Sequence, residues 1–358
     1  MGYRYIGSKT KLMPQIMAKI NSIITPGKHV VDLMAGTGAV SMELRKSGYK
    51  VTACDLMTFS FHHCIVSLMF TEEPRFANLS ELIEHVNQCN PSLLLRPPHE
   101  SIIEYLNNLE PVQGYFYQEF CSEGKPANGT KPRNYFSPRN AMLIDAIRQK
   151  IHFFHDQNLI NHLEHSLLLH DLIMAVNDIA NIAGTYGHYL SKLIDRAYDK
   201  INLTPSPILL LQDYGKHEVL QGYAEDLAPQ IACDVCYIDP PYMKRQYAAN
   251  YHILETLAME DCPEAVGVSG LRPWRNQYSD FCSKNRIRQA FSKIFTQMSC
   301  NNYLISYSDE GLLSVDELQN FLMGFGNVSV TKFLNKRFKS RNENSRSEIT
   351  EYLFHLAI

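Results

Sequence analysis

The chain has 358 residues, of which 45% are hydrophobic and 20% are charged, and its formal net charge is −3 at pH 7. This ordinary composition excludes a disordered or collagen-like chain. The near-neutral charge excludes a protein coated with basic residues, so any contact with nucleic acid must come from local patches. No stretch approaches the roughly 20 apolar residues that a membrane span needs, and the N-terminus lacks a signal-peptide pattern. The nine scattered cysteines indicate reduced thiols and a cytoplasmic protein.

Residues 1–75 alternate between helical and strand patterns. A helical pattern over residues 9–24 ends at Thr-Pro-Gly, and a short β-branched strand follows at 29–33. A second helix at 40–47 leads to a second strand at 49–54. This order of strand, turn, helix and strand predicts a βαβ unit and therefore a parallel sheet.

Residues 76–204 differ in character from the flanking regions. The stretches 90–98 and 124–138 are rich in Pro, Gly and Asn and predict loops, whereas apolar residues at helical spacing predict a long helix over 161–183. We interpret this segment as an insertion that is partly helical and partly loop. Residues 205–358 return to an α/β pattern, with strands expected at 235–238, 303–307, 328–333 and 349–357 and a helix at 315–323.

A glycine-rich turn follows the first predicted strand, where residues 32–38 have the pattern Asp-x-x-x-Gly-x-Gly. Glycines at such a turn let a ligand approach the backbone where a Cβ would collide. Asp55 ends the next strand, 17 residues after Gly38, where a carboxylate can accept both hydroxyls of a ribose. With no third glycine and no phosphate-binding lysine, the pattern favours a nucleoside over a pyrophosphate. The alternative is an ordinary strand-to-helix turn.

A second motif, Asp-Pro-Pro-Tyr at residues 239–242, comes directly after the predicted strand 235–238. Two prolines stop the strand and stiffen the turn, which fixes a carboxylate beside an aromatic ring. An exocyclic amine on a base could donate to Asp239 and to the Pro240 carbonyl while the base stacks on Tyr242. The alternative is a proline-rich turn with a surface tyrosine.

These motifs and their order resemble the S-adenosylmethionine-dependent DNA adenine methyltransferases of the alpha class, the Dam and FokI-modification type. In that class the cofactor motifs come first, then a target-recognition insertion, then Asp-Pro-Pro-Tyr. The resemblance implies an α/β, Rossmann-like class I methyltransferase fold with a mostly parallel seven-stranded sheet. It implies a catalytic domain formed by residues 1–75 and 205–358, with an inserted helical and loop target-recognition region at 76–204.

The resemblance also implies roles for individual residues. Tyr5 would pack near the cofactor and Lys9 would face its methionine carboxylate, while an acid in the stretch 222–226 would approach its adenine amine; two acids adjoin there, and the choice between them stays open. The implied catalytic residues are Asp239, Pro240, Pro241 and Tyr242, and the implied cofactor-binding residues are Tyr5, Lys9, Asp32, Ala35, Gly36, Thr37, Gly38, Asp55, Glu225 and Asp226.

The implied reaction is site-specific methyl transfer from S-adenosylmethionine to the exocyclic amine of adenine in DNA, by direct in-line displacement and without a metal. The adenine must be flipped out of the duplex to reach such a pocket. The expected role is that of a restriction-modification or orphan modification enzyme, with double-stranded DNA and, as a further candidate, a cognate restriction endonuclease as partners.

Nucleic-acid contacts are expected from three local basic stretches. Residues 124–150 and 329–346 each hold six basic residues against one acid, and 271–288 holds five against one. Aromatic residues lie among them, a combination that suits a phosphate backbone with an unstacked base. From these stretches we expect DNA contacts by Lys131, Arg133, Arg139, Arg272, Arg275, Lys336, Arg337, Lys339 and Arg341.

Two other functions remain open at this point: an RNA methyltransferase that acts on an exocyclic amine, and a DNA-binding subunit that has lost activity. Metal binding is not expected. Cys233 and Cys236 have zinc-like spacing but no second pair. The paired histidines at 152 and 155, and at 162 and 165, lack an evident third ligand.

Overall fold

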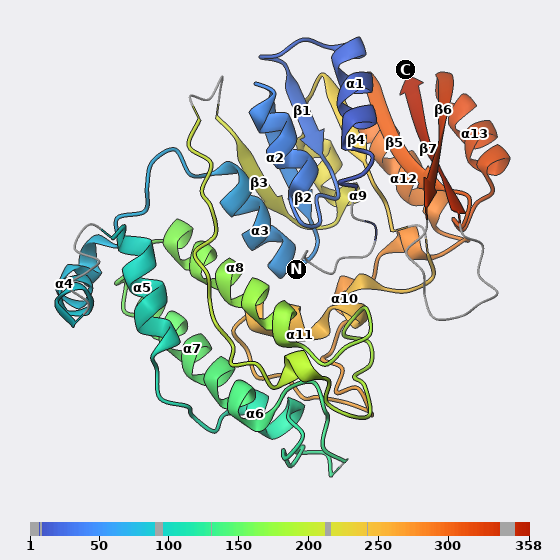
Figure 1. Ribbon diagram of the computed structural model, residues 1–358. Coiled ribbons are helices and arrows are strands. Elements are labelled where there is room, and N and C mark those ends of the chain that lie inside the picture. The colour runs from blue at the N-terminus through green and yellow to red at the C-terminus, as the bar shows by residue number, and fades with distance from the viewer. Residues whose placement is uncertain are drawn as a thin grey trace. The chain divides into compact units, whose positions relative to one another are not determined.

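The structure is a computed structural model that describes residue 7 and residues 9–89, 96–129, 131–211, 216–241, 243–336 and 348–358. The chain forms two compact units (Figure 1). The helical unit comprises Met1–Gly7, Ile65–Leu211 and Ala248–Asn276, and the sheet unit comprises Ser8–Cys64, Gln212–Tyr247 and Gln277–Ile358.

The segment Ala248–Asn276 belongs to the helical unit rather than to the part that we expected to be catalytic. Buried polar contacts explain this placement. The His252 Nε2 atom lies 3.0 Å from the carbonyl oxygen of Tyr186, and the Arg133 guanidinium donates to the carbonyl of Ala265 at 3.1 Å. Both pairs lie within the helical unit, so these hydrogen bonds join the segment to residues far away in the sequence.

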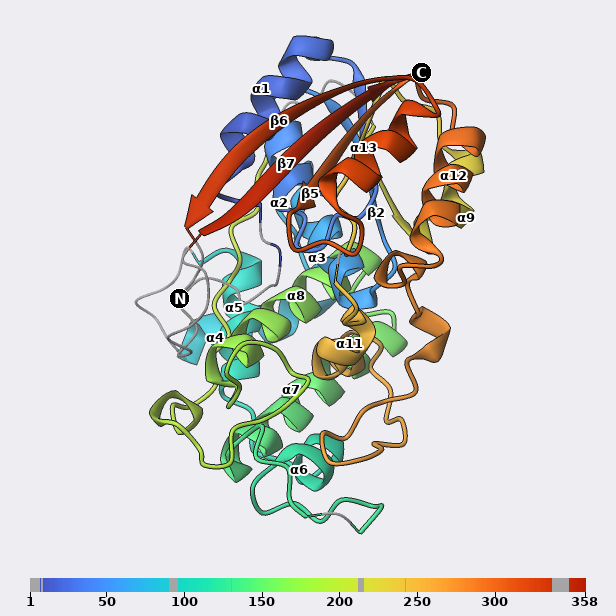
Figure 2. The ribbon, with the colours of Figure 1, turned by 90° about the vertical axis from the view of Figure 1, so that its right-hand side faces the viewer.

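The sheet unit contains a seven-stranded sheet in the order β3-β2-β1-β4-β5-β7-β6. Strands β3, β2, β1, β4 and β5 pair in parallel, and β7 pairs antiparallel with both β5 and β6 (Figure 2). The expected Rossmann-like methyltransferase fold with a mostly parallel seven-stranded sheet is therefore confirmed. The strands are β1 (His29–Asp32), β2 (Lys50–Asp55), β3 (Glu218–Gln221), β4 (Val235–Ile238), β5 (Asn302–Ser308), β6 (Asn327–Lys336) and β7 (Glu348–Ala357).

Strand β1 is the point at which the chain changes its direction of progress across the sheet. It pairs with β2 on one side and with β4 on the other, so that Asp32 has Ala53 and Tyr237 as its neighbours. In open parallel sheets the crevice at such a reversal, beyond the carboxyl ends of the strands, is where ligands bind. The fold therefore directs attention to the residues that follow β1 and β4.

Burial on both faces explains why the central strands are continuous apolar runs. All four residues of β4 are buried, as is typical of a parallel strand covered by helices on both sides. Val31 and Cys236 face a cluster that includes Phe291 and Leu318. These residues come from helices that cover one face of the sheet, and Figure 2 shows α1 and α2 on the other side. The helices of this unit are α1 (Met13–Ile23), α2 (Ala39–Lys46), α9 (Ala224–Leu227), α12 (Ile287–Gln297) and α13 (Val315–Met323), and α3 (Thr58–Leu68) leads out of it.

The helical unit is built around two long helices, α7 (Pro138–Asp156) and α8 (His162–Ile179). A capping box begins α8, because the side chain of Asn161 accepts the backbone N–H of Glu164 and Glu164 accepts that of Asn161. The helix ends at Ile179, earlier than the expected Ala183. The other helices are α4 (Ser80–Cys89), α5 (Pro98–Asn107), α6 (Tyr115–Phe120), α10 (Tyr247–Asn250), which begins in the sheet unit, and α11 (His252–Ala258).

The helices and the cysteines can be compared with what the sequence predicted. Among the described residues, no helix has both the length and the apolar character needed to cross a bilayer. All nine cysteines lie among the described residues and are free thiols, in agreement with the expectation of reduced cysteines.

Candidate active site

The carboxyl ends of the parallel strands bring the two sequence motifs to the same edge of the sheet. The glycine-rich turn follows β1, and Asp239 follows β4. The two ends are joined directly, since the N–H of Leu33 donates to the carbonyl of Tyr237 at 3.0 Å. The motifs, which lie about 200 residues apart in the sequence, therefore lie together at the edge of the sheet where ligands bind in folds of this kind.

The turn after β1 is held open for a ligand by its two glycines. Gly36 and Gly38 have φ values of 55° and 72°, in the left-handed region that favours glycine. The Ala35 N–H donates to the carbonyl of Cys54 at 2.9 Å, which ties the turn to the end of β2. Ala35 and Thr37 are partly exposed, whereas Gly36 and Gly38 are buried.

Asp55 joins two loops through its carboxylate. Its Oδ2 atom accepts the Gly36 N–H at 2.8 Å, and its Oδ1 atom accepts the Met57 N–H at 2.8 Å. Its backbone carbonyl accepts the N–H of Gly222 at 3.0 Å. The Asp55 carboxylate thus holds the glycine turn in place, and its role toward ribose hydroxyls stays a prediction.

Asp32 is buried beneath the glycine turn. It is 1% exposed, and its Oδ2 atom accepts the Ser41 hydroxyl at 2.7 Å. Desolvation raises the pKa of Asp32 to about 7; the charges of Asp239 and Asp55 act in the same direction, and the Ser41 hydrogen bond opposes them. Its Oδ1 atom is buried and has no hydrogen-bond partner among the described residues. No sequence signal pointed to Ser41, which lies in α2 and can donate this hydrogen bond to Asp32 only once the turn between β1 and α2 has formed.

The catalytic turn contains a buried ion-pair cluster. The Lys9 ammonium lies 3.1 Å from Asp239 Oδ1 and 3.5 Å from Glu351 Oε2, and its side chain is 4% exposed. Desolvation raises the pKa of Asp239 to about 6; Lys9 lowers it and Glu351 raises it. Desolvation likewise raises the pKa of Glu351. Lys9, which the resemblance placed opposite the cofactor's methionine carboxylate, here contacts the carboxylate of Asp239, the residue predicted to be catalytic.

The backbone after the catalytic turn is also fixed. Pro240 is buried and Pro241 is partly exposed. The Gln246 side chain donates to the Ser279 carbonyl at 3.1 Å and accepts the Ser279 N–H at 2.8 Å. Gln246 and Glu351 were missed by the sequence analysis; Glu351 alone gave a signal, as an acid within the apolar run of β7. Tyr5 and Tyr242, predicted for the cofactor and the target base, lie outside the described residues.

The two adjacent acids in α9 differ in environment. Glu225 is 8% exposed, and desolvation raises its pKa, with the charges of Asp280 and Asp226 acting in the same direction. Asp226 is exposed. The hydrogen bond from Gly222 to Asp55 brings the start of this helix beside the ribose-binding acid. Their role toward the cofactor stays a prediction for both.

The residues predicted to bind DNA fall into three groups. Lys131, Arg139 and Arg275 are exposed, and all three belong to the helical unit. Lys336 ends β6, where its side chain is not described, and Arg337, Lys339 and Arg341 lie outside the described residues. Arg133 and Arg272 are 0% and 6% exposed, and these two assignments need correction.

Both buried arginines have structural partners. Arg133 donates to Glu119 Oε2 at 2.6 Å and to the carbonyls of Ala265 and Gly267, each at 3.1 Å. Arg272 forms a bidentate pair with Asp261, at 3.0 and 2.8 Å. Charge counts along the sequence cannot distinguish an arginine that is paired in the interior from one that faces solvent. Neither guanidinium is therefore available to a phosphate.

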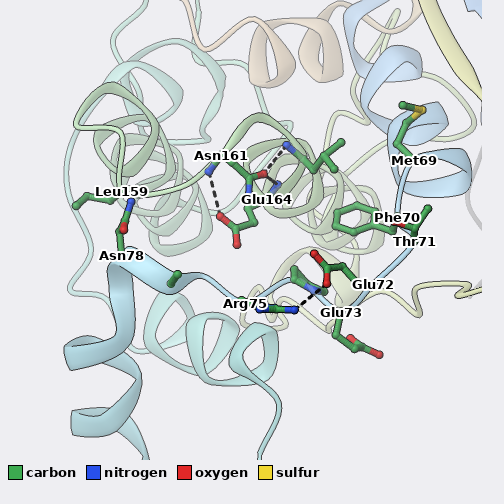
Figure 3. A pocket seen from close by; sticks show the side chains of 13 residues that line it. Met69, Phe70, Thr71, Glu72, Glu73, Arg75, Asn78, Leu159, Asn161 and Glu164 are labelled. Carbon is green, nitrogen blue, oxygen red and sulfur yellow. Dashed lines mark hydrogen bonds and ion pairs between the residues drawn. The ribbon is translucent and has the colours of Figure 1, made fainter.

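A pocket in the helical unit contains none of the predicted site residues. It has a volume of about 310 Å³ and is lined by 13 residues, among them Glu72, Arg75 and Glu164 (Figure 3). Glu164 caps α8 and accepts the Phe76 N–H at 2.6 Å, and Arg75 pairs with Glu72 at 2.8 Å. These charged groups hold the local structure together, and we assign the pocket no function.

Comparison with known proteins identifies the family. The profile of the D12 class N6 adenine-specific DNA methyltransferases matches residues 5–321, most of the chain. This chain belongs to that family. The D12 profile thus covers both the glycine-rich turn and the catalytic turn.

Individual D12-type relatives extend the likeness over nearly the whole chain. The Type II methyltransferase M.FokI of Planomicrobium okeanokoites is 34% identical over 99% of this chain and 52% of its own length. Modification methylase StsI of Streptococcus sanguinis is 30% identical over 99% of this chain and 51% of its own length. The Type II methyltransferase M.NlaIII of Neisseria lactamica is 30% identical over 98% of this chain and 97% of its own length. The chain therefore spans about half the length of the first two relatives and nearly all of the third.

Proposed function

We propose that this D12 methyltransferase transfers a methyl group from S-adenosylmethionine to the exocyclic amine of adenine in DNA. The observation that carries the proposal is the juxtaposition of the glycine turn after β1 and Asp239 after β4, at the reversal of the parallel sheet. A nucleoside-containing donor and an amine acceptor would thus meet in one crevice.

The residues of the glycine turn fit S-adenosylmethionine. Gly36 and Gly38 have no Cβ to obstruct close approach of the ligand, and the Asp55 carboxylate lies at the end of β2 beside this turn, where it would bind the ribose hydroxyls. Asp32 Oδ1 is buried without a partner among the described residues, so it is an acceptor that a ligand or a water could satisfy. When bound, the cofactor supplies an electrophilic methyl group on a sulfonium.

The catalytic turn would orient the acceptor amine. We infer that Asp239 and the Pro240 carbonyl accept the two amine hydrogens, which leaves the nitrogen lone pair directed at the methyl group. Tyr242 would stack on the flipped base. The rate would come from positioning and polarisation, and no covalent intermediate with the protein is needed.

The exposed basic residues Lys131, Arg139 and Arg275 support a role for the helical unit in DNA binding. Cations on an exposed surface displace counterions from DNA phosphates. The relatives M.FokI and M.NlaIII are Type II methyltransferases, and StsI is a modification methylase. We propose that this chain likewise acts in the cytoplasm as a modification enzyme, with a cognate restriction endonuclease as its partner.

The test is expression in a bacterium that lacks adenine methylation, followed by modification-sensitive sequencing of its genome. We expect methylated adenines within one short sequence, and none with Asp239→Ala, whose affinity for S-adenosylmethionine stays within a few-fold of wild type because Asp239 contacts the acceptor. Methylation of RNA instead of DNA would favour the RNA alternative. Failure to bind S-adenosylmethionine would favour an inactive DNA-binding subunit. Equal loss of binding and transfer in Asp239→Ala would refute the role of this residue.

A further inference from the structure

Three side chains from separate parts of the helical unit converge on one point. They are His155 near the end of α7, His165 in the first turns of α8, and Glu260 two residues after α11. Each offers one potential ligand atom, and these atoms all lie within 4.8 Å of one another. The sequence analysis found no third ligand for the histidines because Glu260 lies 95 residues from His165.

The local geometry brings the imidazoles and the carboxylate together. The rings of His155 and His165 stack with centroids 3.9 Å apart and an interplanar angle of 5°. His165 Nε2 lies 2.8 Å from Glu260 Oε2. A third histidine, His152, places its Nδ1 atom 3.6 Å from the same carboxylate oxygen, and its side chain is 58% exposed.

Glu260 provides a second, independent observation. Its side chain is 9% exposed, and its Oε1 atom is buried without a hydrogen-bond partner among the described residues. A buried carboxylate oxygen without a partner is costly. Its backbone φ of 51° is in the left-handed region that non-glycine residues rarely adopt. The carboxylate whose Oε2 atom contacts His165 thus carries a second, buried oxygen that has no hydrogen-bond partner among the described residues.

We propose that His155, His165 and Glu260 form a binding site for one divalent transition-metal ion of the zinc class. Imidazole nitrogen and carboxylate oxygen are ligands that such ions prefer. Bonds of about 2.0–2.1 Å in tetrahedral geometry separate the ligand atoms by roughly 3.3 Å. Because a metal ion lies in the plane of each imidazole that it binds, coordination requires the stacked rings of His155 and His165 to rotate out of their parallel arrangement and the hydrogen bond between His165 and Glu260 to open. The fourth position is open to His152 or to water.

The proposed ion would join three elements that are far apart in the sequence. It links α7 and α8 to the start of the segment that follows α11, which also carries Asp261 and its partner Arg272. The ligands differ from every residue proposed for methyl transfer, so the predicted effect is on the stability of the helical unit. Metal binding does not depend on whether the proposed function is correct.

The experiment is calorimetric titration of the full chain with Zn²⁺ in a Cys89→Ser, Cys262→Ser background, because these two thiols are exposed and would also bind zinc. We expect one ion per chain and a rise in Tm of several degrees. His155→Ala and Glu260→Gln should each weaken binding tenfold or more, and Glu260→Gln retains an oxygen that can accept a hydrogen bond from His165. The matched control is His162→Ala, which removes an exposed histidine of α8 outside the cluster.

Absence of Zn²⁺ binding would overturn the proposal, as would equal affinity in the background protein and in His155→Ala. His155 is exposed, so its replacement should leave the fold intact and decides the question even if Glu260→Gln fails to fold. Titration with Co²⁺ gives an independent readout, because its visible absorption reports tetrahedral coordination and should be lost in both variants.

Discussion

A single lysine lies between two carboxylates at the catalytic turn. The Lys9 ammonium contacts both Asp239 and Glu351, so this buried cluster contains one more potential negative charge than positive charge. The balance is reflected in the pKa of Asp239, which desolvation raises to about 6 although Lys9 lowers it. Whether Asp239 is ionised therefore depends on its two charged neighbours.

This balance predicts how the pH dependence of methyl transfer changes. If ionised Asp239 accepts the amine hydrogens, the rate falls below a pH of about 6, by about tenfold per unit at low pH. Removing the cation in Lys9→Met raises the pKa of Asp239, so the fall in rate on the acidic side of the pH profile moves to higher pH. Removing the charge in Glu351→Gln moves it to lower pH.

The measurement is kcat against pH at saturating S-adenosylmethionine, because Lys9 is also expected to face the cofactor. The two variants serve as controls for each other, since they change the same cluster in opposite directions. If the pH at which kcat falls is the same in both variants as in the wild type, ionisation of Asp239 does not control the rate.

The buried Asp32 predicts a stability cost. An acid whose folded-state pKa is raised, here from 3.8 to about 7, stabilises the fold only while it is protonated. The loss in the free energy of unfolding therefore grows as the pH rises from about 4 to about 7, to a limit of roughly 4 kcal/mol. Asp32→Asn keeps an acceptor for Ser41 and should raise the Tm, with a gain that is larger at pH 8 than at pH 5.

The measurement is thermal unfolding at both pH values without cofactor. Ser41→Ala is the matched comparison, because it removes the hydrogen bond that favours the charged form and should lower the Tm most at pH 8. A gain in Asp32→Asn that does not depend on pH would contradict an ionised, desolvated carboxylate.

At the scale of elements, the sequence predicted the central strands of the sheet better than the edge strand β3 and the helices of the insertion. Strand β4 and helix α13 occupy the predicted residues, because an apolar run bounded by turns and a Ser314 capping box are local signals. Strand β3, Glu218–Gln221, was missed: none of its residues is fully buried, as expected at an edge, and it contains only two apolar residues. Most helices between residues 98 and 156 were also missed, because the proline- and glycine-rich loops dominated that region.

The same distinction holds for the site. Asp55, Asp239 and the glycine turn could be proposed from the sequence because each belongs to a contiguous motif or follows a predicted strand directly. Ser41 and Gln246 make contacts that depend on the folded arrangement, so no local pattern could identify them, and Glu351 gave only the signal of an acid among the apolar residues of β7. Arg133 and Arg272 were misassigned for the same reason, since their carboxylate partners become apparent only in the structure.

The region around the start of α7 predicts different effects for neighbouring basic residues. Lys131→Ala with Arg139→Ala removes two exposed cations and should reduce the slope of log K against log[salt] for DNA binding by about 2, with the Tm unchanged. Arg133→Met instead leaves the buried Glu119 unpaired and should cost about 3–5 kcal/mol of stability. Binding titrations at several salt concentrations and thermal unfolding distinguish the two effects. An unchanged slope would place the DNA surface elsewhere.

At the scale of the whole molecule, the two units suggest a division of labour. Among the predicted DNA-binding residues whose side chains the structure describes, the exposed ones belong to the helical unit, whereas the glycine turn and Asp239 belong to the sheet unit. If this division is functional, the sequence that is methylated should follow the helical unit and the affinity for S-adenosylmethionine should follow the sheet unit.

A chimera tests this division. Residues 65–211 and 248–276 would be replaced together by the aligned segments of M.NlaIII, which matches 98% of the chain. We expect the methylated sequence of the chimera to become that of M.NlaIII, with S-adenosylmethionine affinity within a few-fold of the original. The reciprocal chimera is the control. A methylated sequence that follows the sheet unit would contradict the assignment.

The neighbouring strands β1 and β4 also have a consequence for biosynthesis. The N–H of His29 donates to Asp234, 205 residues later in the chain. At 5–20 residues per second, a ribosome needs on the order of 10–40 s to cover that distance. During this interval β1 has been made but β4 has not, and the apolar side chains of Val30 and Val31, fully buried in the finished sheet, lack that neighbour. We therefore expect that co-expression of chaperones that shield apolar segments increases the yield of folded protein.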